Sequence, residues 1–237
     1  MSINIQCRDL PRIVSTLSKV VPNRPTLSIL GNVRVRNFDG RATMAVTNLD
    51  EVLTASLPEA SGGSFDALVP FADLRDFVRS CDRSSQLTVS VGDGFATITD
   101  GGSGVARRMD SPPVGAWPVP PPMPESFVHV EPTFWMAVRS ASKSTGSDSS
   151  RQAIGCVLVE SGSIVGTDGR HLVSYDIQSG IEPSVAIPVS KLMQADVFDG
   201  PCEFVAAMSD ATPYATLRSP NWSWTIKAVF RRGVPST

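Results

Sequence analysis

Apolar and polar residues alternate along three successive segments in the first half of the chain, at 32–38, 42–48 and 51–57. Because side chains of a strand point to opposite faces in turn, this alternation predicts antiparallel strands with one buried face. The FDGR run at 38–41 has the composition of a hairpin turn and joins the first two of these strands. Similar patterns predict further strands at 3–7, 65–70, 86–91, 95–99 and 104–109.

Two other segments of the first half space their apolar residues by three and four positions, as the buried face of a helix does. One such helix is expected at 9–21, where Asp9 stands at the position of a cap and Pro11 lies in the first turn. The second is expected at 71–81. Its apolar side is formed by Phe71, Leu74, Phe77 and Val78.

The second half of the chain repeats this order of elements. A strand pattern at 127–131 precedes a helical pattern at 133–143, and a shorter helical pattern follows at 190–198. Strand patterns occupy 153–160, 163–168, 171–177, 185–188, 202–208, 214–219 and 222–230. Identical residues also recur at a spacing of about 120 positions, in the pairs Gly31 with Gly155, Thr47 with Thr167, and Pro70 with Pro188. We therefore predict an α+β protein of two tandem duplicated domains, each with two helices packed on antiparallel sheets.

A proline-rich segment at 111–124 separates the two halves and contains seven of the nineteen prolines. Proline fixes φ and lacks a backbone donor, so this segment is expected to be an extended linker, neither helix nor central strand. The predicted domains are therefore 1–110 and 125–237. Within the linker, Trp117 is expected to hold the connector in place.

Composition narrows the function classes. The 237 residues carry a formal net charge of −2, so the chain does not hold nucleic acid by bulk positive charge, although a local basic surface remains possible. The four cysteines are far apart and only two histidines occur, so neither a metal site nor another cofactor is expected. No stretch approaches the roughly 20 apolar residues of a membrane span. We expect a cytoplasmic protein with reduced thiols.

Several segments together resemble a known family. RPTLSILGNVRV at 24–35 and TNLDEVLTASL at 47–57 are similar to the first domain of the bacterial DNA polymerase III beta subunit, the sliding clamp. GTDGRHLVSYD at 166–176, IPVSKLMQ at 187–194 and WTIKAVF at 224–230 resemble its second domain. Two features depart from the family pattern, since the chain has two such domains rather than three, and the usual His-Arg order is reversed at Arg170 and His171.

The resemblance implies a DNA-clamp fold and a non-enzymatic processivity factor for DNA replication. Clamps of this family close six domains around duplex DNA, with helices inside and sheets outside, and bind the polymerase, the clamp loader and repair proteins. With two domains per chain, a closed ring would be a homotrimer. Two alternatives stay open: a fragment of a three-domain clamp, or an adaptor that binds replication or repair proteins without closing a ring.

Basic residues on the predicted helices, their ends and the loops beside them are the candidate DNA contacts. Contacts of this kind reach phosphates without reading sequence and allow sliding. The alternative is an ordinary solvated helix face, because Asp73, Asp76 and Asp82 lie nearby. The candidates are Arg12, Lys19, Arg24, Arg75, Arg79, Arg83, Arg139, Lys143, Arg151 and Lys191.

The turn around Asp168 is the second candidate site. An Asp-Gly pair between two strands is by itself typical of a tight hairpin turn. In the family this turn borders an apolar cleft for short clamp-binding peptides. The resemblance assigns that role here to Ile154, Thr167, Gly169, Arg170, His171 and Leu172. Asp168 and His171 lack the nucleophile of a catalytic set, and the chain has no phosphate loop or nucleophile elbow, so no catalytic residue is expected.

Overall fold

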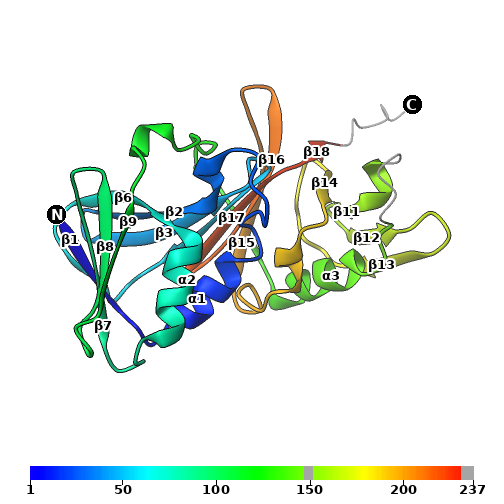
Figure 1. Ribbon diagram of the computed structural model, residues 1–237. Coiled ribbons are helices and arrows are strands. Elements are labelled where there is room, and N and C mark those ends of the chain that lie inside the picture. The colour runs from blue at the N-terminus through cyan, green and yellow to red at the C-terminus, as the bar shows by residue number, and fades with distance from the viewer. Residues whose placement is uncertain (147–151, 231–237) are drawn as a thin grey trace. The chain divides into compact units, whose positions relative to one another are not determined.

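The computed structural model describes residues 1–146 and 152–230 (Figure 1). The chain divides into two compact units, Met1–Val119 and the residues from Pro120 onward. The division falls inside the proline-rich segment. Within the described residues, no helix is long and apolar enough to cross a membrane.

The first unit contains two groups of antiparallel strands. One group runs in the order β5-β1-β7-β8-β9 and the other in the order β4-β3-β2-β6. The first group comprises β5 (Ser61–Gly62), β1 (Ser2–Gln6), β7 (Gln86–Gly92), β8 (Phe95–Asp100) and β9 (Ala106–Asp110). The second comprises β4 (Glu51–Ser56), β3 (Arg41–Thr47), β2 (Asn32–Phe38) and β6 (Phe65–Pro70). The strands expected from alternation at 32–38, 42–48 and 51–57 are thus present.

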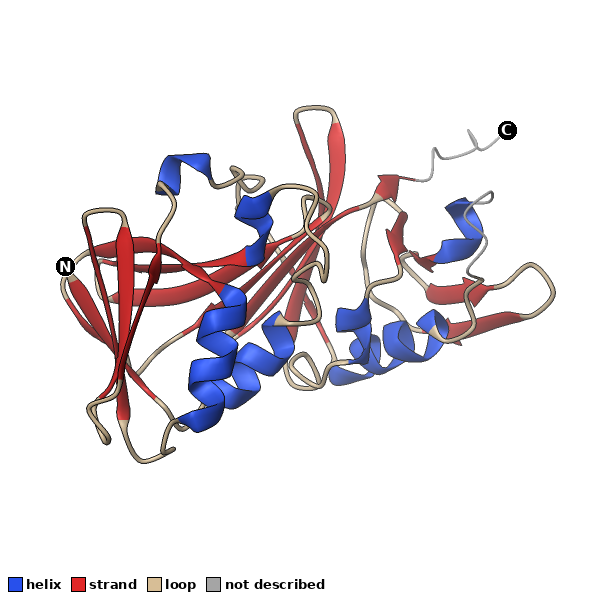
Figure 2. Ribbon diagram, in the orientation of Figure 1, coloured by secondary structure: helices blue, strands red, loops and turns tan. Residues whose placement is uncertain are grey.

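Two helices pack beside each other in the first unit (Figures 1 and 2). α1 spans Leu10–Leu17 and α2 spans Phe71–Ser80. The apolar faces predicted for both are buried, and α2 contacts β2 and β6 while α1 contacts β4. The helix pair is antiparallel, because the backbone N–H of Cys7, just before α1, donates to the carbonyl of Ser85, just after α2.

The second unit follows the same plan, with one α-helix in place of two in the part that the structure describes. Its strand groups run in the orders β10-β15-β16-β17 and β13-β12-β11-β14-β18. The first comprises β10 (Val128–Val130), β15 (Cys202–Ser209), β16 (Thr212–Ser219) and β17 (Trp222–Lys227). The second comprises β13 (Leu172–Asp176), β12 (Ser163–Thr167), β11 (Cys156–Val159), β14 (Val185–Pro188) and β18 (Val229–Phe230).

α3 (Pro132–Ser142) is the long helix of the second unit. It packs against β11, β12 and β13. A side chain at Gly166 of β12 would place its Cβ 2.2 Å from the carbonyl oxygen of Ala141, so the close approach of helix and strand requires glycine at this position. Trp135 fills the core beneath the helix, in edge contact with Phe198 and Trp224.

The predicted duplication extends to the strand register. Gly31 and Gly155 each end a short 3-10 helix, η1 (Ser28–Gly31) and η3 (Gln152–Gly155), and a strand begins at the next residue. In the first unit that next residue, Asn32, pairs with Pro70; in the second, Cys156 pairs with Pro188. The letter matches therefore mark equivalent positions of two copies of one fold.

Four details differ from the sequence-based expectation. The segment at 190–198 forms only the 3-10 helix η4 (Lys191–Gln194), so α3 has no second α-helix beside it among the described residues of this unit. Arg75, Arg79 and Arg83 are spaced by four and were expected on one side of the second helix, but α2 ends at Ser80, so Arg83 lies beyond it. Asp9 occupies the cap position of α1, but its side chain makes no capping hydrogen bond. The proline-rich segment includes a short 3-10 helix, η2 (Val114–Ala116), and the next residue, Trp117, is buried.

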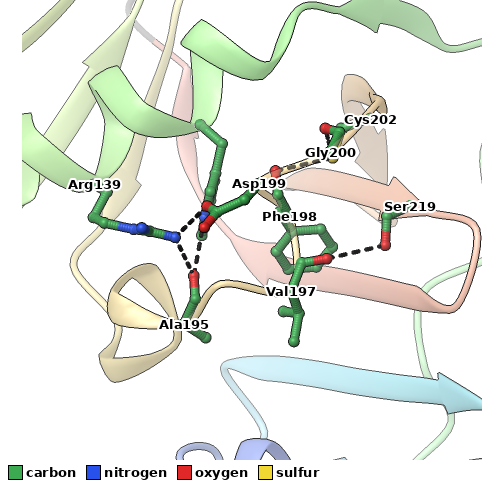
Figure 3. Close-up of polar contacts among 9 residues, drawn as sticks. Arg139, Ala195, Val197, Phe198, Asp199, Gly200, Cys202 and Ser219 are labelled. Carbon is green, nitrogen blue, oxygen red and sulfur yellow. Dashed lines mark hydrogen bonds and ion pairs between the residues drawn. The ribbon is translucent and has the colours of Figure 1, made fainter.

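The loop after η4 is held by side chains in place of helical hydrogen bonds (Figure 3). The carbonyl of Ala195 accepts from the indole N–H of Trp135 and from the guanidinium of Arg139. Ser219 donates to the carbonyl of Val197, and the thiol of Cys202 donates to the carbonyls of Phe198 and Gly200. These contacts satisfy carbonyls that a continuing helix would have used internally, and Gly200 and Pro201 then end the segment.

Candidate nucleic-acid interface and peptide cleft

The basic residues of the first unit lie on both helices and just beyond them. Arg12 is exposed on α1, Lys19 is half-buried after it, and Arg24 is exposed in the loop before η1. Arg83 is exposed beyond the end of α2, beside the start of α1.

Arg75 and Arg79 of α2 share one acidic neighbour. Nε of Arg75 lies 3.2 Å from Oδ1 of Asp76, and Nη1 of Arg79 lies 3.5 Å from the same oxygen. The side chain of Arg79 remains 71% exposed. An exposed pair of this kind contributes little to stability, so the guanidinium of Arg79 can turn to another anion at small cost.

The basic residues of the second unit are distributed differently. Lys143 follows α3 and Lys191 begins η4, and both are exposed. Arg139 instead points from α3 to the loop after η4, where it binds the carbonyl of Ala195 and the carboxylate of Asp199 (Figure 3). Arg151 lies outside the described residues.

The hairpin turn between β12 and β13 is built by two polar side chains. The hydroxyl of Thr167 donates to the carbonyl of His171 and accepts from the backbone N–H of Gly169. Oδ1 of Asp168 accepts from the backbone N–H groups of Arg170 and His171, at 2.8 and 2.6 Å. Oδ2 of Asp168 lies 3.1 Å from Nδ1 of His171. The backbone and ring contacts of His171 hold the pKa of Asp168 far below its usual range, so this carboxylate stays ionised.

Five of the six predicted cleft residues come from this turn, and the sixth lies against it. A Cβ at Gly169 would stand 3.2 Å from Cδ1 of Ile154, so Ile154 packs under the turn. Leu172 is 67% exposed at the start of β13, and His171 is also exposed. The turn thus carries two apolar side chains, Leu172 and Ile154, together with the exposed polar side chains of Arg170 and His171.

The first unit carries a copy of the same turn, which sequence reasoning identified only at Thr47. The hydroxyl of Thr47 donates to the carbonyl of Glu51 and accepts from the N–H of Leu49. Oδ1 of Asn48 accepts from the N–H groups of Asp50 and Glu51, as Oδ1 of Asp168 does in the second unit. The central residue has φ +79° at Leu49 and +85° at Gly169.

Asp199 is a residue that sequence reasoning missed. It is 60 positions from Arg139, and nothing in the local pattern connects the two. Within residues 1–146 and 152–230, no group of three or more His, Cys, Asp or Glu side chains is arranged to hold a metal ion.

Comparison with solved structures identifies the fold. The chain matches a DNA polymerase sliding clamp from Bacillus subtilis over 100% of its length, with a TM-score of 0.83 and 15% identity. It matches a DNA polymerase III subunit beta from Pseudomonas aeruginosa over 99%, with a TM-score of 0.80 and 19% identity. A clamp from Bartonella birtlesii, solved with griselimycin bound, matches with a TM-score of 0.80 and 20% identity.

The match covers only part of each clamp. The chain spans 66% of the length of these solved proteins. No family model and no curated protein matches the sequence. The chain therefore has the sliding-clamp fold over nearly its whole length, as the sequence resemblance led us to expect.

Proposed function

We propose that the protein is a DNA sliding clamp, a non-enzymatic ring that surrounds duplex DNA in the cytoplasm and tethers replication proteins to it. The observation that carries this proposal is the fold, which follows solved clamps across 99–100% of the chain at TM-scores of 0.80–0.83. A ring retains DNA by enclosing it rather than by tight binding, which is compatible with a net charge of −2.

A ring of two-domain chains needs a contact between copies, and each unit has a free edge strand that suits one. β9 ends one strand order of the first unit and β13 ends one of the second. Head-to-tail contact of two different edges generates a closed ring when the rotation between copies closes. Three chains would supply the six domains that clamps of this fold use.

The hydrogen-bonding pattern shows which backbone groups each edge offers. Asp168 donates to His171 and Ile177 donates to Gly162, so the bonded pairs of the β12–β13 hairpin alternate from these positions. The N–H groups that point away from β12 are those of Leu172, Ser174 and Asp176. By the same alternation, from the Asp100–Val105 and Ser111–Gly94 bonds, β9 directs outward the N–H groups of Ala106, Arg108 and Asp110.

The partners of such a ring are duplex DNA and proteins that carry short clamp-binding peptides. We place the DNA contacts on the helices and their ends and the peptide contacts at the 167–172 turn. Exposed basic side chains support the first site, and Leu172 beside Gly169 and Ile154 supports the second. Replicative polymerase, clamp loader and repair proteins are the proposed partner classes.

A second candidate function is a ring-less adaptor. The turn at 167–172 exposes its apolar residue without any second copy of the chain, and Leu172 is 67% exposed there. A single chain could therefore bind a replication or repair protein through this turn alone.

The solution mass of the chain separates the two functions. Light scattering over a concentration series is expected to give a mass near three chains, or a monomer–trimer equilibrium that shifts with concentration. A mass of one chain at every concentration would contradict a ring of this chain alone, and would leave the adaptor or a fragment of a three-domain clamp. Retention on nicked circular DNA, and its loss when the circle is linearised, would then demonstrate encirclement.

A further inference from the structure

The helical segments of the two units differ in charge although the fold repeats. Residues 8–24 and 71–83, which contain α1 and α2, carry seven basic and four acidic side chains. The corresponding segments of the second unit, 131–146 and 190–200, carry three of each. The intervening sequence 147–151 adds one of each sign and leaves this balance unchanged.

The structure shows which of these charges already have partners. In the first unit Arg8 pairs with Asp9 and Glu59, and Arg75 and Arg79 pair with Asp76, but each of these arginines keeps at least 40% of its side chain exposed. In the second unit, one of the three basic groups is already bound within the unit, because Arg139 pairs with Asp199 and its side chain is only 24% exposed. Its guanidinium also donates to the carbonyl of Ala195, so turning outward would break this hydrogen bond and leave the carboxylate of Asp199 without its ion-pair partner (Figure 3). In the first unit, Arg24 and Arg83 are exposed, and within the described residues neither forms an ion pair.

The replacement of a second α-helix by η4 also leaves the second unit with fewer basic side chains at this place. In the first unit, α2 and the turn after it present Arg75, Arg79 and Arg83 in succession. At the equivalent place in the second unit, η4 is followed by a loop whose charged side chains are Asp196 and Asp199. From 192 to 200 the second unit therefore has no basic side chain to attract a phosphate backbone.

We infer that the DNA contacts are one-sided: the helical segments of the first unit bind the phosphates, and those of the second unit contribute little. This inference rests on the proposed clamp function and names which part of its inner surface acts. In a ring of three chains, basic and nearly neutral surfaces would alternate around the duplex. Such a ring would touch the DNA at three places rather than six.

Two matched double variants test this inference, each removing two positive charges. Arg24→Ala with Arg83→Ala changes the first unit, and Lys143→Ala with Lys191→Ala changes the second. The probe is a fluorescently labelled, blunt-ended duplex, whose open ends allow a closed ring to thread on. Binding is followed by fluorescence anisotropy over a salt series, because each lost phosphate contact reduces the slope of log K against log salt by roughly 0.9.

We expect the Arg24/Arg83 variant to lower that slope by about 2 and the Lys143/Lys191 variant to lower it by less than half as much. Arg36→Ala with Arg41→Ala is the control in the first unit. These arginines lie on β2 and β3, on the face opposite the buried residues that the helices cover, and should leave the slope unchanged. Circular dichroism checks that each variant is folded.

The possible results separate this inference from the proposed function. Wild-type protein that is lost from nicked circular DNA as readily as from the same DNA linearised would contradict the proposed function itself. Duplex binding that is absent or does not depend on salt would overturn the phosphate contacts of the first unit. Protein that binds DNA but loses as much slope with the Lys143/Lys191 variant as with the Arg24/Arg83 variant would overturn the one-sided contact alone. An equal loss with the Arg36/Arg41 control would also overturn it, because binding would then reflect total charge.

Discussion

Leu49 and Gly169 are two different residues that adopt the same backbone conformation at equivalent positions of the two turns. Both have positive φ, in a region that disfavours bulky side chains. Leu49 occupies it because the hydrogen bonds of Thr47 and Asn48 hold the turn around it. In the second unit glycine removes this cost and leaves room for Ile154 beneath the turn.

Gly169→Ala is therefore expected to lower the free energy of unfolding by about 1 kcal/mol through backbone strain, with an added cost from contact with Ile154. Gly180→Ala is the matched control, since Gly180 also has positive φ but a Cβ added there would meet no atom within 4 Å. Urea unfolding followed by tryptophan fluorescence measures both variants. Equal losses would show that the Ile154 contact adds nothing.

The single residue Asp100 makes the stability of the fold depend on pH. This buried carboxylate accepts from the hydroxyls of Ser103 and Ser85 and from the N–H of Gly102, and these hydrogen bonds lower its pKa from 3.8 to about 2. A depressed pKa in the folded state stabilises the protein above the unfolded value and loses this effect as pH falls toward 2. Asp100→Asn should therefore flatten the decline of the melting temperature between pH 4 and pH 2. An unchanged decline would show that other carboxylates cause the acid unfolding.

At the scale of elements, the loop after η4 takes the place of a helix. The sequence predicts a short helix at 190–198, and Ser190 does cap one turn by accepting from the N–H of Leu192. The chain then leaves the helix because its carbonyls find partners far away in the sequence, including Trp135 and Arg139. Local periodicity contains no information about such partners.

The strands of the first unit were predictable from the sequence because their packing partners lie in the same unit and impose a regular pattern. The strands at 32–38 and 42–48 bury alternate side chains against their own unit, so the pattern is visible in the letters. The 167–172 turn was identified through residues shared with the clamp family, whereas no sequence pattern pointed to Asp199. The side chain of Arg139 was expected to contact DNA because it lies on a predicted helix, but the helical pattern does not reveal the carboxylate that binds it.

Arg139→Ala is expected to destabilise the second unit by about 2 kcal/mol, because it removes charge-assisted hydrogen bonds from a part-buried group. Lys143→Ala, an exposed change after the same helix, should stay within about 0.5 kcal/mol of the wild type. Thermal unfolding by calorimetry measures both. Equal stabilities of the two variants would contradict the role given to Arg139.

At the scale of the whole molecule, the proposed ring depends on backbone donors at the edge of β13. Ser174 directs its N–H away from β12, so Ser174→Pro should remove an intermolecular donor without breaking the hairpin. We expect the mass by light scattering to fall from three chains toward one. Ser174→Thr keeps the N–H and should leave the mass at the wild-type value. A trimer that persists in the proline variant would place the contact between copies elsewhere.

The paired turns at Thr47 and Thr167 have a consequence for engineering. Because both close with the same set of side-chain-to-backbone hydrogen bonds, we expect the first four residues of one turn to be accepted by the other. The fifth positions differ, since Glu51 is buried and His171 is exposed. Grafting residues 167–170 onto positions 47–50 would move part of the polar rim of the peptide site to the first half of the chain. The duplication thus supplies a ready acceptor position for a second docking element.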